Sequence, residues 1–149
     1  MADLHACLGD PVAMRYWNYP LSKTSTDTEK ALAWLAKTTS PYDDLAWAAS
    51  KKSNDRCIGM VNYHRHDTRN RRLQLGYIIT PKHQRYGFGT EAIQAVLSYG
   101  TEELNIHKVE ALIHPDNLAS VRLAEVSAFA EKAVRCLTIG TLGSNSSVS

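Results

Sequence analysis

Hydrophobic and polar residues follow two different periods in the middle of the chain, and the change of period defines its central unit. A β-branched apolar run from Leu73 to Thr80 predicts a strand, which stops at Pro81 because proline cannot donate to a sheet ladder. Further along, apolar residues return at the spacing of one helix face; they are Ile93, Val96, Leu97, Gly100 and Leu104. The short loop between the two patterns contains Gly87 and Gly89. The pattern therefore predicts a strand, a glycine loop and a helix in that order.

The flanking segments add elements of both kinds. An N-cap followed by proline at Asp10-Pro11 predicts a helix start, and the capping-box pair Thr26 and Glu29 predicts another. The predicted helices lie at 2–8, 10–17, about 27–38, about 90–104 and 117–126, and the predicted strands at 45–49, 56–63, 73–80, 108–113 and 131–139. A polar, arginine-rich loop is expected at 64–72.

The order of these elements predicts an α/β (α+β) fold with one mixed central sheet flanked by helices. Strands joined by short turns pair antiparallel, whereas a strand–helix–strand unit in one sheet pairs parallel. We therefore expect antiparallel neighbours before residue 73 and parallel neighbours after it. The sequence has no internal repeat, so residues 1–142 are predicted to form a single domain, followed by a disordered polar tail at 143–149.

Composition and charge narrow the function classes. The chain has 149 residues, of which 44% are hydrophobic and 21% charged, and its net charge is +2; these ordinary values imply no general affinity for nucleic acid. Cys7, Cys57 and Cys136 fit neither a disulfide framework nor a zinc site, and no metal site is predicted. No apolar stretch approaches the ~20 residues that span a bilayer. We therefore expect a cytoplasmic protein without a membrane partner.

The glycine loop has the properties of an anion-binding site. The first backbone N–H groups of a helix have no intrahelical partner, and the helix dipole favours negative charge there. Gly87 and Gly89 let a phosphate approach the backbone. A Walker loop is excluded because Thr90-Glu91 follows the last glycine in place of Lys-Ser/Thr. A dinucleotide fingerprint is disfavoured because that motif belongs to the first strand of its unit, and about half of this chain precedes the loop.

Four sequence blocks in order give the loop a sharper interpretation. Gln84-Arg85-Tyr86-Gly87-Phe88-Gly89 resembles the Q/R-x-x-G-x-G/A acetyl-CoA loop of the GCN5-related N-acetyltransferase (GNAT) superfamily. The other blocks are Leu75-Gly76-Tyr77, Thr90-Glu91-Ala92 and Asn117-Leu118-Ala119-Ser120-Val121-Arg122-Leu123. Together, over about residues 10 to 129, they resemble the branch that acetylates the N-terminal amines of ribosomal proteins (the ribosomal-protein-alanine type). The resemblance implies a GNAT-like fold and acetyl-CoA (coenzyme A) as the cofactor.

The resemblance also implies the residues of the cofactor site. The diphosphate is expected on the backbone amides of residues 85–90, and the pantetheine arm beside residues 77–79, opposite residues 110–113. The complete predicted set is Tyr77, Ile78, Ile79, Gln84, Arg85, Tyr86, Gly87, Phe88, Gly89, Thr90, Asn117 and Ser120. Ser120 is also the predicted catalytic acid for the departing thiolate. Two structural alternatives stay open: Asn117 as a simple helix N-cap, and the glycine loop as a plain strand–helix turn.

The proton acceptor is less sharply defined. Relatives often carry Glu just before Leu-Gly-Tyr, but here this position is Gln74, whose amide cannot accept a proton. Glu91 is the nearest acid, although in the first turn of a helix it suits the dipole. His64 and His66 alternate on a strand and point the same way; either can relay a proton or simply lie on the surface. A backbone N–H near Ile79 is expected to stabilise the oxyanion formed when an amine attacks the thioester.

Two departures from the family pattern leave more than one function open. Relatives usually have a first strand before the initial helix and two long strands after a Gly-Phe pair, whereas this chain has Ala128-Phe129 and shortened ends. Unpaired sheet edges of this kind favour either a homodimer or an incomplete fold. The main hypothesis is an N-acetyltransferase that moves an acetyl group from acetyl-CoA to a primary amine, either a peptide N-terminus or a small molecule. The alternatives are a non-catalytic acyl-CoA-binding module and RNA binding through the arginines of residues 65–72.

Overall fold

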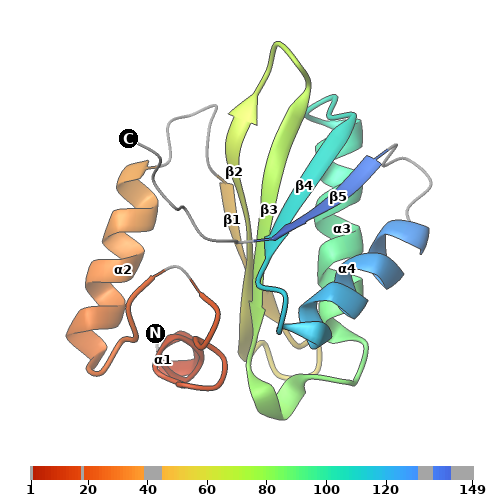
Figure 1. Cartoon of the computed structure of the whole chain (residues 1–149). Coiled ribbons are helices and arrows are strands. Elements are labelled where there is room, and N and C mark those ends of the chain that lie inside the picture. Colours follow the sequence, from red (N-terminus) through yellow and green to blue (C-terminus); the bar gives the residue numbers. More distant parts are fainter. Residues whose placement is uncertain (1, 18, 39–44, 131–135, 142–149) are drawn as a thin grey trace, which may run out of the picture.

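A computed structural model describes residues 2–17, 19–38, 45–130 and 136–141. The elements are α1 (Ala2–Leu8), α2 (Ser25–Thr38), β1 (Leu45–Ser50), β2 (Cys57–Asp67), β3 (Arg72–Ile79), the short 3-10 helix η1 (Pro81–His83), α3 (Phe88–Glu102), β4 (Lys108–Ile113), α4 (Leu118–Ala130) and β5 (Cys136–Thr141). The strands form one sheet in the order β1-β2-β3-β4-β5. Helices α1 and α2 lie on one side of this sheet, and α3 and α4 lie on the other (Figure 1).

The pairing of the strands follows from the lengths of their connections. β1, β2 and β3 are joined by short turns and pair antiparallel. β3, β4 and β5 are separated by α3 and α4, and they pair parallel because a helical crossover returns the chain to the same end of the sheet. The predicted mixed α/β sheet flanked by helices is confirmed.

Both faces of the central strands are buried, each against different helices. Residues Val61 and Tyr63 of β2 belong to a core with the inner side of α3, which contributes Ile93 and Leu97. Because side chains alternate along a strand, the residues next to Val61 and Tyr63 in β2 face the opposite side of the sheet. On that side Met60 packs with residues of α1 and α2. β2 and β3 are therefore held rigidly, which makes them a stable floor for a site.

The first turns of the chain correct one sequence prediction. The Asp10 carboxylate accepts hydrogen bonds from the N–H groups of Val12 (2.8 Å) and Ala13 (2.9 Å), so the predicted cap exists. However, residues 11–16 form successive turns and no helix. The predicted helix over 10–17 is wrong, and an irregular segment lies beside the sheet in its place.

Helix α2 begins at Ser25, about two residues before the predicted start. The capping box that starts it joins Thr24 to Asp27: Thr24 N–H donates to Asp27 Oδ2 (2.9 Å), and Asp27 N–H donates to Thr24 Oγ1 (3.2 Å). The predicted box of Thr26 and Glu29 is therefore replaced by an equivalent pair two residues earlier.

The β2–β3 hairpin is longer than expected, because β2 continues to Asp67 where a loop was predicted from residue 64. The pairing shifts between His64 and Asp67, and Arg65 has a positive φ of 52° within this irregularity. The additional residue of this β-bulge interrupts the alternation that would place His64 and His66 on one face.

Residues near the two ends of the chain are described only in part. Among the described residues, no strand precedes β1 and one strand follows α4. β5 overlaps the predicted last strand at residues 136–139, whereas residues 131–135 and the predicted tail at 143–149 lie outside the described residues. The domain limits and the homodimer stay predictions. Within the described ranges, no helix has the length and apolar character needed to cross a membrane.

Candidate active site

Strands β3 and β4 stay paired along only part of their length. The parallel register joins residues 72–74 of β3 to residues 108–110 of β4 and goes no further. The remainder of each strand is held by its other neighbour, β2 or β5. The predicted residues Tyr77, Ile78 and Ile79 therefore lie where the two strands have separated. An extended ligand with amide groups fits such an opening as an added strand.

The loop after β3 enters α3 through two residues in the left-handed conformation. Arg85 has φ = 68° and Gly87 has φ = 85°, and Gly87 is the N-cap of α3 without a side-chain hydrogen bond. The first intrahelical bond runs from the Glu91 N–H to the Gly87 carbonyl (3.0 Å). The N–H groups of residues 88–90 thus have no helical acceptor, and the helix dipole adds positive potential there. The loop has the backbone geometry of an anion site.

A cavity of about 510 Å³, here called the loop cavity, opens between this loop, the separated strands and the start of α4. Its described lining contains Arg15, Arg85 and Arg122 and neither aspartate nor glutamate. The excess of cations favours an anionic ligand. Sequence reasoning missed Arg15 and Arg122, because nothing in the local sequence indicates which way these side chains turn.

Most of the predicted cofactor residues line the loop cavity: Tyr77, Ile78, Ile79, Gln84, Arg85, Gly87, Gly89, Thr90, Asn117 and Ser120. Two of the predicted side chains lie elsewhere. Tyr86 is 73% exposed, and the Phe88 ring packs against the His83 ring (6.3 Å between centroids) with the Lys51 ammonium 5.7 Å above it. Tyr86 and Phe88 can contribute to this site through their backbone amides, which the prediction also requires.

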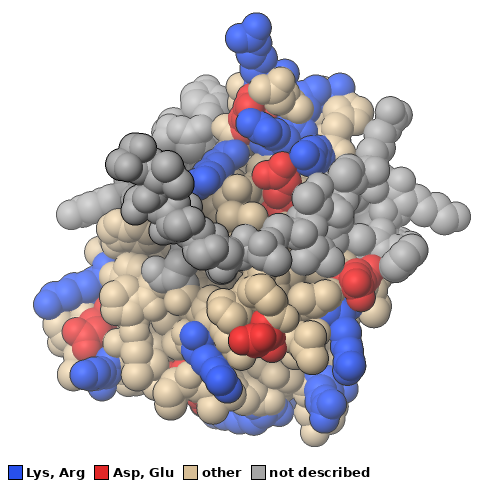
Figure 2. Space-filling model, viewed as in Figure 1, with Lys and Arg blue, Asp and Glu red and all other residues tan. Residues whose placement is uncertain are grey.

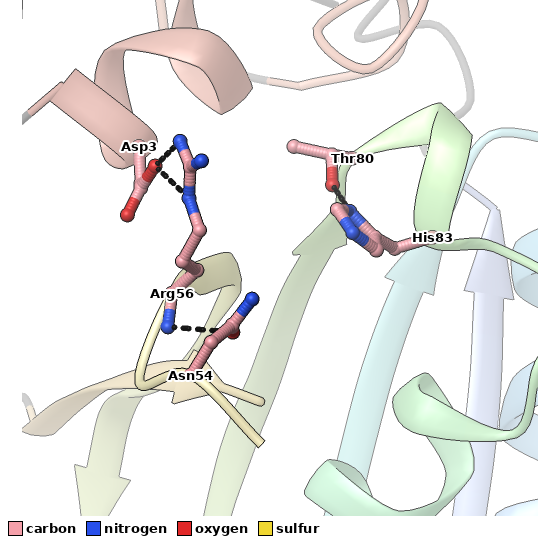
Figure 3. Close-up of polar contacts among 5 residues, drawn as sticks. All are labelled: Asp3, Asn54, Arg56, Thr80 and His83. Carbon is pink, nitrogen blue, oxygen red and sulfur yellow. Dashed lines mark hydrogen bonds and ion pairs between the residues drawn. The ribbon is translucent and has the colours of Figure 1, made fainter. Parts of the chain in front are cut away.

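The side chain of Gln84 fixes the loop to the end of β3. Its Nε2 donates to the Ile79 carbonyl (2.8 Å). Nearby, Thr80 Oγ1 donates to the Ile58 carbonyl (3.0 Å) and lies 2.8 Å from His83 Nδ1 (Figure 3). Burial, with Lys82 beside it, lowers the pKa of His83. These bonds hold the first residues of the loop, so Gln84 has a structural role that the motif alone did not reveal.

The start of α4 is tied to β3 across the separation. The Tyr77 hydroxyl donates to the Ser120 carbonyl (2.7 Å), and burial raises the Tyr77 pKa so that it keeps its proton. Asn117 Oδ1 accepts from the Ser120 N–H (3.3 Å). Asn117 therefore is an N-cap, the structural alternative that the sequence left open, and it also lines the loop cavity. Ser120 is thereby fixed in the cavity wall.

A second cavity of about 390 Å³ lies between α2, the turns after α1 and the sheet. The two cavities meet at residues that line both, which are Tyr16, Trp17, Leu75, Gly76 and Leu112. Tyr19 and Trp34, 5.5 Å apart between ring centroids, add further aromatic surface to the second cavity. The early helices therefore contribute to a cavity wall.

The floor of the second cavity carries a polar group on β2 and β3, formed by Asn62, His64 and Gln74. Gln74 lies opposite Glu110 in the β3–β4 register. Lys108 Nζ lies 2.9 Å from Glu110 Oε1, and this contact lowers the pKa of the Glu110 carboxyl. Glu110 is therefore held ionised, opposite Gln74 in the sheet. Sequence reasoning missed this placement because it depends on the register between strands.

Glu91 does not line either cavity within the described structure. Its side chain is 71% exposed and lies 3.9 Å from Lys52 Nζ. Its place in the first turn of α3 agrees with the dipole role, and the structure does not bring it to the other predicted site residues.

Two arginines of the β2–β3 hairpin, Arg71 and Arg72, contact other residues of this chain. Arg71 Nε donates to the Asn105 carbonyl (2.7 Å), and Arg72 Nε lies 3.2 Å from Asp67 Oδ2. Figure 2 shows basic side chains at the hairpin end of the molecule with acidic side chains beside them. This mixed charge gives little support to the RNA-binding alternative.

Cys7 and Cys57, the cysteines whose side chains are described, have structural roles. Cys7 is buried, which raises its thiol pKa to about 12. Cys57 Sγ donates to the Gly59 carbonyl (3.3 Å), and the side chain of Cys136 lies outside the described residues. The described residues contain no cluster of three or more potential metal ligands.

Comparison with known proteins places the chain among acetyltransferases. The sequence model of the acetyltransferase (GNAT) domain matches residues 1–130. The uncharacterized N-acetyltransferase YoaA of Bacillus subtilis (strain 168) is 28% identical over 134 residues, which cover 88% of this chain and 74% of YoaA.

Two solved structures from Vibrio cholerae have a similar fold. Spermidine N-acetyltransferase in complex with CoA and spermine superposes with a TM-score of 0.69 at 22% identity, covering 83% of this chain and 71% of that chain. A protein with the provisional name ribosomal-protein-serine acetyltransferase superposes with a TM-score of 0.65 at 21% identity, covering 85% and 71%. At these identities the likeness is one of fold.

Proposed function

The chain belongs to the GNAT acetyltransferase family and is an N-acetyltransferase, and from this premise we propose that it moves the acetyl group of acetyl-CoA to a single primary amine. The single observation that carries the proposal is the union of the two cavities at Leu75 and Gly76, beside the separated strands. One cavity suits a long anionic cofactor, and the other suits the acceptor.

The loop cavity supports acetyl-CoA in three ways. The uncapped N–H groups of residues 88–90 suit the diphosphate, and the three arginines of the lining add positive charge. The separated edges of β3 and β4 suit the two amides of the pantetheine arm. Gly87 leaves room for the ligand, because a Cβ atom placed there meets nothing within 4 Å.

The second cavity favours one amine on an aromatic surface over a polyamine. Its described lining includes Arg65 and no carboxylate, whereas a polyamine needs several negative partners. An α-amino group titrates near ~8, so part of it is already neutral in a cell and needs only a modest base. We therefore assign the acceptor to the class of peptide N-termini, as in the ribosomal-protein-alanine branch that the sequence resembles.

The chemistry proceeds by direct attack of the amine on the thioester carbon. A backbone N–H near Ile79 stabilises the oxyanion, and the Ser120 hydroxyl protonates the departing thiolate. Ser120 lines the loop cavity and is held by its contacts to Tyr77 and Asn117. No covalent enzyme intermediate is required.

A binding assay combined with a turnover assay tests the function. Isothermal titration with acetyl-CoA should give saturable binding. Thiol release should then follow the addition of peptides with free Ala or Ser N-termini, and N-terminally blocked copies of the same peptides should be inactive. Binding without release for any amine in a panel that includes spermidine would favour the non-catalytic acyl-CoA-binding module. Turnover with spermidine alone would refute the peptide assignment.

A further inference from the structure

We propose that Arg65 selects acceptors in which an acidic group follows the amine closely, namely peptides with aspartate or glutamate as the second or third residue. The inference rests on the proposed function, because it refines the acceptor class of the same site. Three observations carry it: Arg65 lines the second cavity, its backbone is in the left-handed conformation, and no described carboxylate pairs with it.

Arg65 gives the second cavity its charge. It is the one residue with a permanent charge in the described lining, where the other residues are apolar, aromatic or neutral and polar, apart from His64. A guanidinium keeps its proton at every pH at which proteins fold. A lasting positive charge in a cavity without a described carboxylate attracts an anionic group and repels a second cation. The cavity therefore favours an acceptor that carries a negative charge beside its amine.

The backbone at Arg65 is unusual for a residue with a long side chain. Its φ of 52° lies in the left-handed region, within the β-bulge between His64 and Asp67. In a regular strand Arg65 would face away from the side that Asn62 and His64 line. The bulge interrupts that alternation, and Arg65 joins the same lining. Bulges and residues with positive φ gather at functional sites, where they re-aim a side chain.

The carboxylates of the neighbouring strand segments are bound to other partners. Asp67 accepts hydrogen bonds from the Asn70 N–H (2.9 Å) and from Asn70 Nδ2 (2.7 Å), and its Oδ2 lies 3.2 Å from Arg72 Nε. Glu110 of β4 pairs in turn with a lysine of its own strand. Within the described residues, Arg65 therefore has no ion pair that a ligand would have to break.

The spacing along β2 matches the second and third residues of a peptide. Asn62 pairs with Gly76, which lines both cavities and so marks the passage where the amine meets the thioester. Arg65 follows three residues later on β2, roughly 10 Å away at the usual rise of a strand. An extended peptide advances at the same rate, so a peptide that runs along this wall brings its second and third side chains within reach of the guanidinium.

The experiment measures kcat and KM by thiol release with three peptides that differ only at their second and third positions. They begin Ala-Glu-Glu, Ala-Gln-Gln and Ala-Lys-Lys and continue with one common sequence. In the wild-type protein we expect kcat/KM to be about five- to tenfold higher for the acidic than for the neutral peptide, and lower again for the basic one. The difference should lie in KM, because an ion pair remote from the reacting atoms is equally strong before and during the reaction. Added salt should weaken the preference.

The variants R65Q, R65K and R65E are compared with R69Q as the matched control. Arg69 lies in the exposed turn of the same hairpin, outside both described linings, so R69Q removes the same charge away from the cavity. R65Q should treat the three peptides alike within about twofold, R65E should favour the basic peptide, and R65K should keep part of the acidic preference because it keeps the charge. R69Q should behave like wild type, and the Kd of acetyl-CoA should be the same in every variant.

Two results would overturn the role of Arg65. One is a wild-type protein that does not distinguish the three peptides, and the other is an acidic preference that survives in R65Q or is lost equally in R69Q. Misfolding does not explain such results, because Gln carries a Cβ as Arg does and leaves the backbone strain unchanged. R65Q should therefore melt within about 2 °C of wild type.

Peptide binding without turnover separates this inference from the function on which it rests. A wild-type protein that binds acetyl-CoA and acetylates none of the three peptides would overturn the proposed function. Isothermal titration of the CoA-loaded protein with the acidic peptide then still judges Arg65. Wild type should bind this peptide about five- to tenfold more tightly than R65Q does, and equal Kd values for the two proteins would overturn the inference.

Discussion

Replacing Gly87 by alanine separates the strain of the loop from its contact with the cofactor. Gly87 has φ = 85°, where a residue with a Cβ costs about 1–2 kcal/mol. A Cβ at this position meets no atom within 4 Å, so no steric cost is added in the free protein. For a domain of this size each kcal/mol corresponds to about 2–4 °C, so we expect the melting temperature to fall by about 2–8 °C.

The affinity for acetyl-CoA should fall for a different reason. The backbone strain is present in the folded protein with and without ligand, so by itself it leaves the Kd unchanged. The open space that the Cβ enters is the space assigned to the diphosphate. We therefore expect the Kd to rise by more than about tenfold, a loss above about 1.4 kcal/mol. Isothermal titration gives the Kd, and differential scanning fluorimetry gives the melting temperature.

The Arg85→Ala variant is the matched control. Arg85 is the neighbouring residue with positive φ, at 68°, and its replacement removes a charge but keeps every backbone amide. An exposed charge of this kind contributes about 0.2–1 kcal/mol, so the Kd should rise no more than about fivefold. If Gly87→Ala lowers the melting temperature and leaves the Kd within about twofold of wild type, the loop amides do not hold the diphosphate.

Three further predictions concern the contact between α3 and the sheet, the loop, and the N-terminal helix. Gly100→Ala places a Cβ 2.5 Å from the Tyr63 hydroxyl and should destabilise by about 1–3 kcal/mol in urea unfolding; a stabilised protein would contradict the packing, and adding Tyr63→Phe should recover part of the loss. Gln84→Glu removes the donor to the Ile79 carbonyl and should weaken CoA binding by about two- to tenfold, and Gln84→Met should have an intermediate effect. Equal CoA binding by wild type and both variants would refute the role of this bond. The Arg56 guanidinium holds the pKa of Asp3 below its usual value. The stability that this ion pair contributes is therefore present above about pH 4 and is lost as pH falls through the lower folded-state pKa. Thermal melts of Arg56→Gln should show a weaker acid dependence than those of wild type.

Short-range patterns were enough to predict most of the elements. The strand at 108–113 has the predicted bounds, and β3 and α1 match closely. These segments are long, strongly periodic or bounded by proline, so their local preference and their buried environment agree. The failed helix at 10–17 shows the limit, because the cap at Asp10 forms but packing against the sheet holds the following residues as turns.

The candidate site likewise has one part that the sequence predicted and one part that it did not. The loop of residues 84–90 is contiguous, and its motif indicated both the left-handed glycine and the uncapped start of α3. The second cavity is assembled from the turns after α1, from α2 and from three strands, and no local pattern indicates that these surfaces meet. For this reason the sequence suggested neither a place for Arg65 in this cavity nor a carboxylate beside Gln74.

The sequence by itself determined the order of the elements, the mixed sheet and the place of the anion loop, because each depends on neighbouring residues and on the period of their side chains. Only the tertiary structure decided where β3 and β4 separate, which face of β2 carries Asn62 and His64, and which residue lies opposite Gln74. These features depend on strand register and on the bulge after His64. Register is set by packing over the whole sheet, and a shift of one residue would turn each side chain to the opposite face.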